Sequence, residues 1–223
     1  MPDMIVLMGP QGAGKGTQAE KLAVQLGVPI IATGDILRKL AEADSELGRQ
    51  IRETQNDGRL VPDDVMAKII RDRLGKGDCQ RGCILDGFPR TIPQAKLLDE
   101  LGTEQGFGVR AIIISVPRDM LLKRLSGRRT CPVCGTIYNI YTRPSKVDGV
   151  CDLDGGKLLT RSDDIPEAIE KRLALFDEMT KPLLDYYKGS RRLSEVDGTG
   201  EINEVFNRIS SVVQRAAALP SEV

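Results

Sequence analysis

The chain has 223 residues, a length that suits one sizeable α/β domain with insertions better than two independent domains. Its 32 Lys and Arg balance 32 Asp and Glu, so the net charge gives no reason to expect a nucleic-acid or acidic-membrane partner. Aromatic residues make up 4%, which weakens any model of stacking on single-stranded nucleic acid, and the absence of histidine removes the commonest general base.

The first residues, MPDMIVLMG, contain no basic segment and no cleavage site of the kind that precedes export. No later apolar run approaches the roughly 20 residues that a membrane span needs. Five cysteines, an odd number without an export signal, argue against a disulfide framework. We therefore expect a cytoplasmic protein.

Short apolar runs alternate with longer helical patterns along the chain. Five runs without period-two alternation are predicted as strands covered on both faces: residues 4–8, 28–32, 83–86, 109–116 and 193–196. Helices are predicted from Lys15 to Leu26, where Gly27 ends the pattern, from about Thr91 to Leu101, and over a long segment after Pro166. This alternation predicts an α/β fold with a doubly wound, parallel, five-stranded sheet flanked by helices.

Two stretches interrupt the alternation of strands and helices. Residues 33–61 are helical and charged without a strand, and residues 128–164 are rich in turn signals without a sustained helical period. We expect both to be insertions at the ligand-binding edge of the sheet.

The stretch GPQGAGKGT, residues 9–17, lies between the first predicted strand and the first helix. Its glycines let the backbone fold around a phosphate, the helix N-terminus favours an anion, and Lys15 adds a charge toward the β and γ phosphates. In most such loops a Ser or Thr directly after the lysine binds Mg²⁺, but here that residue is Gly16, and Thr17 comes one place later. The pattern predicts a nucleotide site but no particular reaction. The alternative is an ordinary glycine-rich turn with an exposed lysine.

A cysteine cluster follows in the second insertion. A C-x-x-C pair is separated by sixteen residues from a C-x-x-D pair, and two such turns suit a closed, tetrahedral, structural zinc site. The four candidate ligands are Cys131, Cys134, Cys151 and Asp154. Asp148 and Asp152 are weaker candidates, and the alternatives are small buried residues or a redox-active pair. Cys79 and Cys83 have no apparent relation to the metal, and Cys83 is predicted to be a small buried hydrophobe.

Several ordered motifs together resemble the adenylate kinases of the nucleoside monophosphate kinase family, in their zinc-bearing, long-lid form. They are GxxGxGKGTQ at the loop, ATGDILR at 32–38, DGFPRTxxQ at 86–94, GRR at 127–129, TRSDD at 160–164 and VDGT at 196–199. The resemblance covers almost the whole chain. It implies reversible transfer of the γ-phosphoryl group of MgATP to AMP, giving two ADP, with Mg²⁺ held by phosphate oxygens and waters in place of the loop hydroxyl.

The resemblance also implies a division of the chain. Residues 1–31, 62–126 and 165–223 would form the P-loop core, residues 32–61 a helical AMP-binding insertion, and residues 127–164 a small zinc-stabilised lid. The implied partners are the nucleotides ATP, AMP and ADP, without nucleic acid or membrane, and the implied state is a monomer.

Residue roles are carried over on the same motifs. The implied catalytic residues are Lys15, Arg38, Asp86, Arg90, Arg124, Arg128, Arg161 and Arg172. The implied ATP-binding residues are Gly12, Ala13, Gly14, Lys15, Gly16, Thr17, Arg128, Ile137, Tyr138 and Gly200. The implied AMP-binding residues are Thr33, Arg38, Arg59, Leu60, Val61, Gly87, Phe88, Pro89, Arg90, Gln94, Arg161 and Arg172.

Elementary chemistry agrees with these roles. Asp86 ends an apolar strand, which puts it at the carboxyl edge of the sheet, where it can orient magnesium-bound waters. Arginine suits the spread negative charge of a transferring phosphoryl group because it is always charged and grips bidentately, although most single arginines are solvated surface charges. An ionised phosphate acceptor needs no base, which fits a chain without histidine.

Three alternatives remain open from the sequence. Gln94 matches the adenine edge of AMP and Thr91 stands where pyrimidine-specific relatives usually carry Asn, so a CMP or UMP kinase is the runner-up. A P-loop NTPase that drives a partner is a second alternative, and a zinc-stabilised protein that binds nucleotide without turnover is a third. Gly200 departs from the basic residue that many relatives carry after VDGT.

Overall fold

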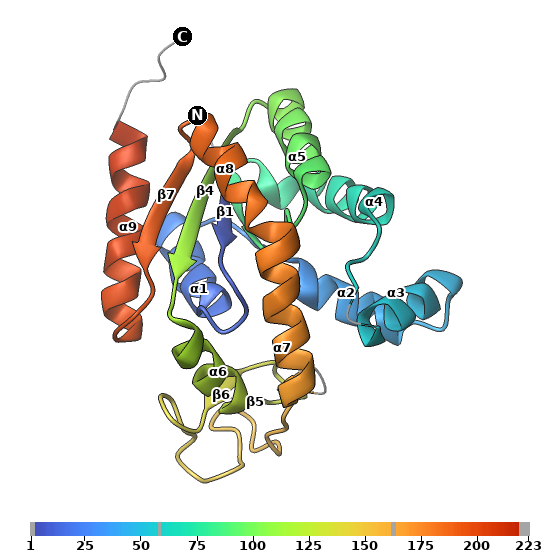
Figure 1. The fold of residues 1–223 in the computed structure, drawn as a ribbon, viewed down its shortest axis with the longest axis vertical. Coiled ribbons are helices and arrows are strands. Elements are labelled where there is room, and N and C mark those ends of the chain that lie inside the picture. Colours follow the sequence, from blue (N-terminus) through green and yellow to red (C-terminus); the bar gives the residue numbers. More distant parts are fainter. Residues whose placement is uncertain (1–2, 58, 162–163, 219–223) are drawn as a thin grey trace.

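The computed structural model describes residues 3–57, 59–161 and 164–218. Within them, five parallel strands form the central sheet in the order β2-β3-β1-β4-β7 (Figure 1). The strands are β1 (Asp3–Met8), β2 (Ile30–Ala32), β3 (Gly82–Asp86), β4 (Gly108–Ser115) and β7 (Leu193–Asp197). The predicted doubly wound sheet is confirmed. The second strand begins two residues later than predicted, because Pro29 has no N–H and the N–H of Val28 caps the preceding helix by donating to the carbonyl of Ala23.

The central strand β1 explains why the apolar runs lack alternation. Met4, Val6 and Met8 belong to the core cluster on one face of the sheet, whereas Ile5 and Leu7 belong to the cluster on the other. Successive side chains of a strand point to opposite faces, so a strand with both faces covered must be apolar at every position.

Helices cover both faces. The cluster containing Ile5 and Leu7 is closed by side chains from α1 (Lys15–Leu26), α6 (Arg118–Ser126), α7 (Pro166–Leu175) and α9 (Ile202–Ala218). The opposite cluster is closed by side chains from α4 (Asp63–Leu74), α5 (Ile92–Gln105) and α8 (Pro182–Gly189). A short 3₁₀ turn, η1 (Gly77–Cys79), precedes β3. Figure 1 shows α9 beside β7, with α7 and α8 running as one long rod along the molecule.

Two helix predictions need correction. The long helix after Pro166 is present, but Phe176–Thr180 forms a π-helical turn between α7 and α8. Helix α5 continues to Gln105, past the predicted end at Leu101. The helix passes through Gly102 because the glycine lets it approach the sheet closely: an added Cβ there would lie 3.1 Å from a methyl group of Val109. The left-handed Gly106 is the actual stop.

The two predicted insertions lie at separate places on the molecule. The first comprises α2 (Thr33–Glu42) and α3 (Glu46–Asn56), which project to one side (Figure 1). The second is a small β structure beyond α6 and α7, with β5 (Arg128–Thr130) antiparallel to β6 (Ile137–Asn139). Among the described residues of this insertion, its own core consists of Cys131, Tyr138, Cys151 and Leu158.

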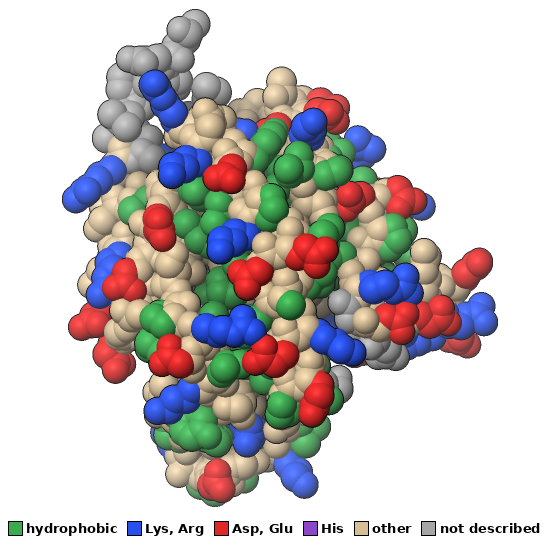
Figure 2. Space-filling view, viewed as in Figure 1, with side chains coloured by type: hydrophobic (Ala, Val, Ile, Leu, Met, Phe, Trp, Pro, Cys, Tyr) green, Lys and Arg blue, Asp and Glu red, His purple; other side chains and the backbone are tan. Residues whose placement is uncertain are grey.

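The distribution of surface charge agrees with the balanced composition. On the face seen in Figure 2, basic and acidic side chains are interspersed. Among the residues that the structure describes, none of the helices has the length and apolarity needed to cross a membrane.

Candidate active site

The glycine-rich loop connects the carboxyl end of β1 to α1. Gly9 has a φ of 140°, and a Cβ at this position would lie 2.8 Å from the carbonyl oxygen of Ile114, so the loop passes too close to β4 for any side chain. Gly14 caps α1 without a side chain that could accept hydrogen bonds from the first-turn N–H groups. Those N–H groups are therefore available to an anion.

Lys15 is folded against this loop. Its Nζ donates to the carbonyl oxygens of Gly9 and Pro10 at 2.8 and 3.0 Å. Burial lowers the pKa of Lys15 to about 8, Asp86 opposes this decrease, and the cations Arg90 and Arg172 add to it. Several positive charges thus share one partly enclosed space.

Arg90 and Arg172 belong to the same group of charges. Burial lowers the pKa of Arg90, and the nearby Arg172 lowers it further. The Nε of Arg90 donates to the carbonyl of Gly87 at 2.8 Å, which fixes the guanidinium beside the end of β3. A pocket is lined by these cations and by Leu7, Met8, Gly9, Gln11, Lys15, Leu60, Gly87, Pro89, Leu175, Phe176 and Thr180. Like charges at close range favour a polyanionic ligand such as a chain of phosphates.

The pKa of Lys15 predicts an alkaline decrease in activity. With the pKa lowered to about 8, the side chain is charged below that pH and neutral above it. We expect kcat/KM for ATP, which reports groups of the free enzyme, to fall about tenfold per pH unit above this pKa. The decrease in kcat should begin at higher pH, because bound phosphates favour the charged lysine.

The control for this prediction is Lys15→Arg. This variant is expected to be slower, but its guanidinium stays charged, so the alkaline decrease should disappear from its profile. A decrease that persists in Lys15→Arg would mean that another group titrates.

Gly16 faces the end of β3. An added Cβ at Gly16 would lie 3.5 Å from Oδ2 of Asp86. A hydroxyl side chain at this position would therefore contact the Asp86 carboxylate. The glycine leaves that carboxylate accessible, which is the arrangement expected where waters, and not the loop, bind a metal ion.

A buried carboxylate that the sequence interpretation passed over joins the lid to α7. The Asp164 side chain is fully buried and accepts from the Nε of Arg128 at 2.6 Å and from Arg172 at 3.3 Å. Its position at the end of TRSDD, just before Pro166, was the available signal. Ser162 and Asp163 of that motif lie outside the described residues. Asp164 thus holds two of the predicted arginines, Arg128 and Arg172, close to each other.

Arg161 and Arg124, the other two predicted arginines of this region, have other partners. Nε of Arg161 donates to the hydroxyl of Thr130 at 3.0 Å, within the lid. Arg124 donates to the carbonyl of Gly198 at 3.0 Å and lies 3.4 Å from the carbonyl of Gly12, which ties the glycine-rich loop to the VDGT turn. Gly200 in this turn has a φ of 94°, so a basic side chain there would strain the backbone.

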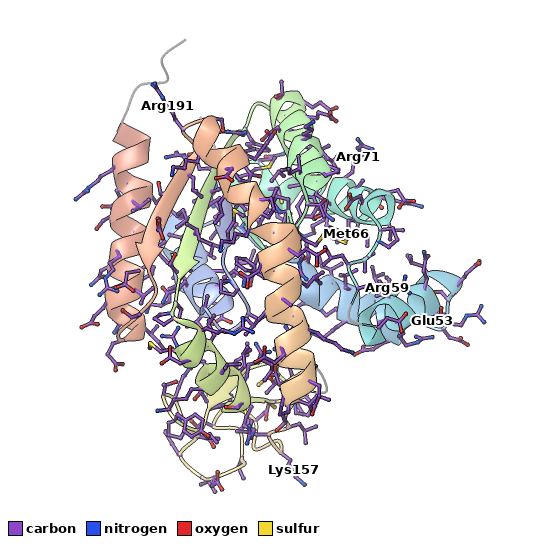
Figure 3. The ribbon with its side chains drawn as sticks, viewed as in Figure 1. Glu53, Arg59, Met66, Arg71, Lys157 and Arg191 are labelled. Carbon is purple, nitrogen blue, oxygen red and sulfur yellow. The ribbon has the colours of Figure 1, made fainter. Side chains whose placement is uncertain are left out.

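The predicted AMP-binding residues are only partly assembled. Thr33 begins α2, is buried and donates to the carbonyl of Asp86 at 3.2 Å, and Leu60 lines the pocket. Arg38 instead forms an ion pair with Asp35. Arg59 pairs with Asp57 at 2.6 Å, is 69% exposed, and lies where the chain passes from α3 to α4 (Figure 3). The structure does not bring Arg38 and Arg59 to the pocket wall.

Gln94 is buried at the start of α5. Its Nε2 donates to Asp63 at 2.7 Å, and its Oε1 accepts from the N–H of Arg90 at 2.8 Å. Thr91 and Gln94 have the spacing of a capping box, but only half of it forms: the Thr91 hydroxyl accepts from the N–H of Gln94 at 3.3 Å, whereas the Gln94 side chain accepts from the N–H of Arg90 and not from that of Thr91. Asp63, which also accepts from the Thr91 hydroxyl, was missed by the sequence interpretation. The Gln94 amide also has a second N–H and a second lone pair that these two hydrogen bonds do not use.

The lid gathers the four predicted metal ligands. One ligand atom from each of Cys131, Cys134, Cys151 and Asp154 lies within 4.8 Å of the others. The two thiol sulfurs of Cys134 and Cys151 are 3.6 Å apart, and Cys131 lies 3.3 Å from both carboxylate oxygens of Asp154. Zn–S bonds of about 2.3 Å at tetrahedral angles require S···S separations of about 3.8 Å, so the residues fit zinc.

Neighbouring residues complete the cluster. The Tyr138 hydroxyl lies 3.5 Å from the sulfur of Cys151, so its side chain supports the candidate metal site and a contact with ATP would have to come from its backbone. Ile137 precedes it in β6. The weaker candidate Asp152 accepts instead from the N–H of Lys146 at 2.9 Å. Burial in β3 raises the pKa of Cys83 to about 12, as expected for an unreactive thiol.

Comparisons with known proteins agree with this arrangement. The family model described as "Adenylate kinase" matches residues 7–192. An adenylate kinase of Caldanaerobacter subterraneus subsp. tengcongensis is 49% identical over 94% of this chain and 95% of the relative. Adenylate kinases of Thermodesulfovibrio yellowstonii and Clostridium perfringens are 46% and 45% identical, over 95% and 96% of this chain and 99% and 98% of their own lengths.

Proposed function

The chain belongs to the adenylate kinase family, and from this premise we propose how its residues carry out the reaction. The enzyme transfers the terminal phosphoryl group of MgATP to AMP and forms two ADP, reversibly. The observation that supports the proposed roles best is the convergence of Lys15, Arg90 and Arg172 on one pocket at the carboxyl edge of the sheet.

Catalysis here rests on positioning and charge. The bond between the γ-phosphorus and the β–γ bridging oxygen breaks, ADP leaves with the electron pair, and an ionised oxygen of AMP forms the new bond. No proton has to be removed from the acceptor, so a base is unnecessary. Lys15, Arg90 and Arg172 are assigned to neutralise the charge spread over the transferring group. Magnesium bound with ATP supplies further positive charge, and Asp86 would orient its waters.

The remaining residues divide between the two nucleotides. Gly12–Thr17, Arg128 and the backbone of Ile137, Tyr138 and Gly200 are assigned to ATP. Thr33, Leu60, Val61 and the Gly87–Arg90 segment are assigned to AMP, with Gln94 on the adenine. Arg38, Arg59 and Arg161 hold other partners here, so their assignment requires the α2–α3 insertion and the lid to move when nucleotides bind.

We assign residues 127–164 to a lid, residues 32–61 to the AMP-binding insertion and the rest to the core. The lid buries few side chains of its own, so it needs a further constraint to keep its shape. Zinc bound by Cys131, Cys134, Cys151 and Asp154 would supply that constraint and let the lid move as one body. A closed lid excludes water, which would otherwise accept the phosphoryl group. By the same family resemblance, we expect a cytoplasmic monomer.

A coupled assay tests the acceptor specificity. The protein is mixed with MgATP and, separately, with AMP, CMP, UMP or GMP, and diphosphate formation is followed. We expect rapid ADP formation with AMP, because the Gln94 amide can match the donor and acceptor of the adenine edge, and rates at least about 100-fold lower with the other three. Preference for CMP or UMP would support the pyrimidine alternative. ATP hydrolysis indifferent to the monophosphate would contradict the proposal and favour an NTPase.

A further inference from the structure

Gln11, the third residue of the glycine-rich loop, has no role in the mechanism described above. It lines the same pocket as Lys15, Arg90 and Arg172. Its Oε1 is buried and has no hydrogen-bond partner among the residues that the structure describes. An amide oxygen in this state carries a desolvation cost that an apolar side chain would avoid.

The pocket indicates what the amide is for. The other uncharged polar side chain on the pocket wall is Thr180, whose hydroxyl donates to the carbonyl of Arg90 at 3.3 Å and is therefore already engaged. The buried amide oxygen of Gln18 also has no partner among the residues described, but Gln18 does not line this pocket, and its Nε2 donates to the carbonyl of Ile202 at 3.0 Å, between α1 and α9. Gln11 thus combines an unpartnered buried acceptor with a position among the phosphate-binding cations.

We propose that Gln11 is a catalytic residue that contacts the transferring phosphoryl group. Its Nε2 donates to a phosphoryl oxygen, and its Oε1 accepts an N–H from the arginine that grips the same group. A guanidinium has five N–H donors and uses two of them in a bidentate grip, so donors remain for the amide. The amide adds a donor without adding charge, which leaves the cation cluster intact.

This inference rests on the proposed function, because it assigns Gln11 to the same transfer. The bond to the β–γ bridging oxygen breaks and the bond to the AMP oxygen forms, while the Nε2 hydrogen stays on nitrogen throughout. As the bond to ADP lengthens, negative charge develops on the bridging oxygen and remains spread over the oxygens of the transferring phosphoryl group. A fixed donor lowers the free energy of the transition state more than that of the bound substrates.

The test is Gln11→Met, which keeps the length of the side chain and removes both polar atoms. We expect kcat to fall about 10- to 100-fold, with KM for ATP and AMP within about threefold of wild type. Affinity for the complex of ADP, AMP and fluoroaluminate, which mimics the transferring group, should fall by the same factor as kcat. The melting temperature should stay equal or rise, because a buried acceptor without a partner is removed.

The matched control is Gln25→Met, the same change at an exposed position of α1, where the Gln25 amide donates to the hydroxyl of Ser210 in α9 at 2.8 Å. Its kcat and fluoroaluminate affinity should equal those of wild type. An unchanged kcat in Gln11→Met would overturn the proposal, as would a decrease in kcat accompanied by a lower melting temperature, since that indicates a structural role. A wild-type protein that forms no ADP from MgATP and AMP would instead refute the proposed function.

Discussion

Arg90→Met is expected to lower kcat/KM with AMP by about 10³-fold without lowering the melting temperature, because removal of a disfavoured buried charge offsets the lost hydrogen bond to the carbonyl of Gly87. Arg90 lines the pocket and lies within a group of cations, where burial and Arg172 lower its pKa. A charge that its surroundings disfavour in the free enzyme contributes to function at the expense of stability. The measurement is steady-state kinetics together with thermal unfolding. Arg90→Lys should lose about 10²-fold, because it keeps the charge but loses the bidentate grip.

Arg81→Met is the matched control for this prediction. Arg81 lies just before β3, and Arg90 lies just beyond its other end. Arg81 donates to the carbonyl of Gly27 at 2.7 Å, away from the pocket. Its replacement should leave kcat/KM unchanged and lower the melting temperature slightly through the lost hydrogen bond. An Arg90→Met variant as active as Arg81→Met would remove Arg90 from the transfer site.

Cys151→Ala is expected to abolish stoichiometric zinc and to lower the melting temperature by about 10 °C. The lid has few buried side chains, so metal binding and lid folding are coupled, and a loss of ~3–5 kcal/mol shifts the melting temperature by about 2–4 °C per kcal/mol in a chain of this size. Affinity for AMP should change much less, because the residues that we propose for AMP binding lie outside residues 127–164 apart from Arg161. Metal analysis, thermal unfolding and AMP titration measure the three quantities.

Cys83→Ala provides the comparison for zinc. Cys83 is a buried cysteine in β3, away from the cluster, so the same substitution should leave about one zinc per chain. A small loss of stability is expected from the lost sulfur contacts. If Cys151→Ala retained as much zinc as Cys83→Ala, Cys151 would not be a ligand.

The strands were predictable because β1 and its neighbours are covered on both faces, and continuous apolar runs follow directly from that burial. The loop was predictable because close backbone approach requires glycine at Gly9, where a Cβ would lie 2.8 Å from Ile114. Helix α5 was predicted too short, because a glycine near the end of a helical pattern usually indicates the helix end. The close packing of Gly102 against β4, which explains why the helix continues, is visible only in the structure. At this position the local sequence predicts a helix end, whereas the tertiary packing favours a glycine within a continuing helix.

The cysteine cluster could be predicted from the sequence, whereas part of the pocket and its surroundings could not. Spacing alone identified Cys131, Cys134, Cys151 and Asp154, because each pair supplies its two ligands from one local turn. Asp164 and Asp63 could not be identified in the same way. Their partners are far away in the sequence: Asp164 accepts from Arg128 in the lid, and Asp63 accepts from Gln94 in α5.

Residue types and their order by themselves determined the fold class, the nucleotide loop and the candidate metal ligands, because each follows from burial, backbone geometry or ligand chemistry within a short segment. Tertiary structure alone decided which charges meet. Lys15, Arg90 and Arg172 come from three distant segments, and their mutual effect on pKa exists only once the sheet edge brings them together. The buried Oε1 of Gln11, which has no hydrogen-bond partner within the described part of the chain, likewise became visible only in the folded structure, since burial and missing partners are properties of packing.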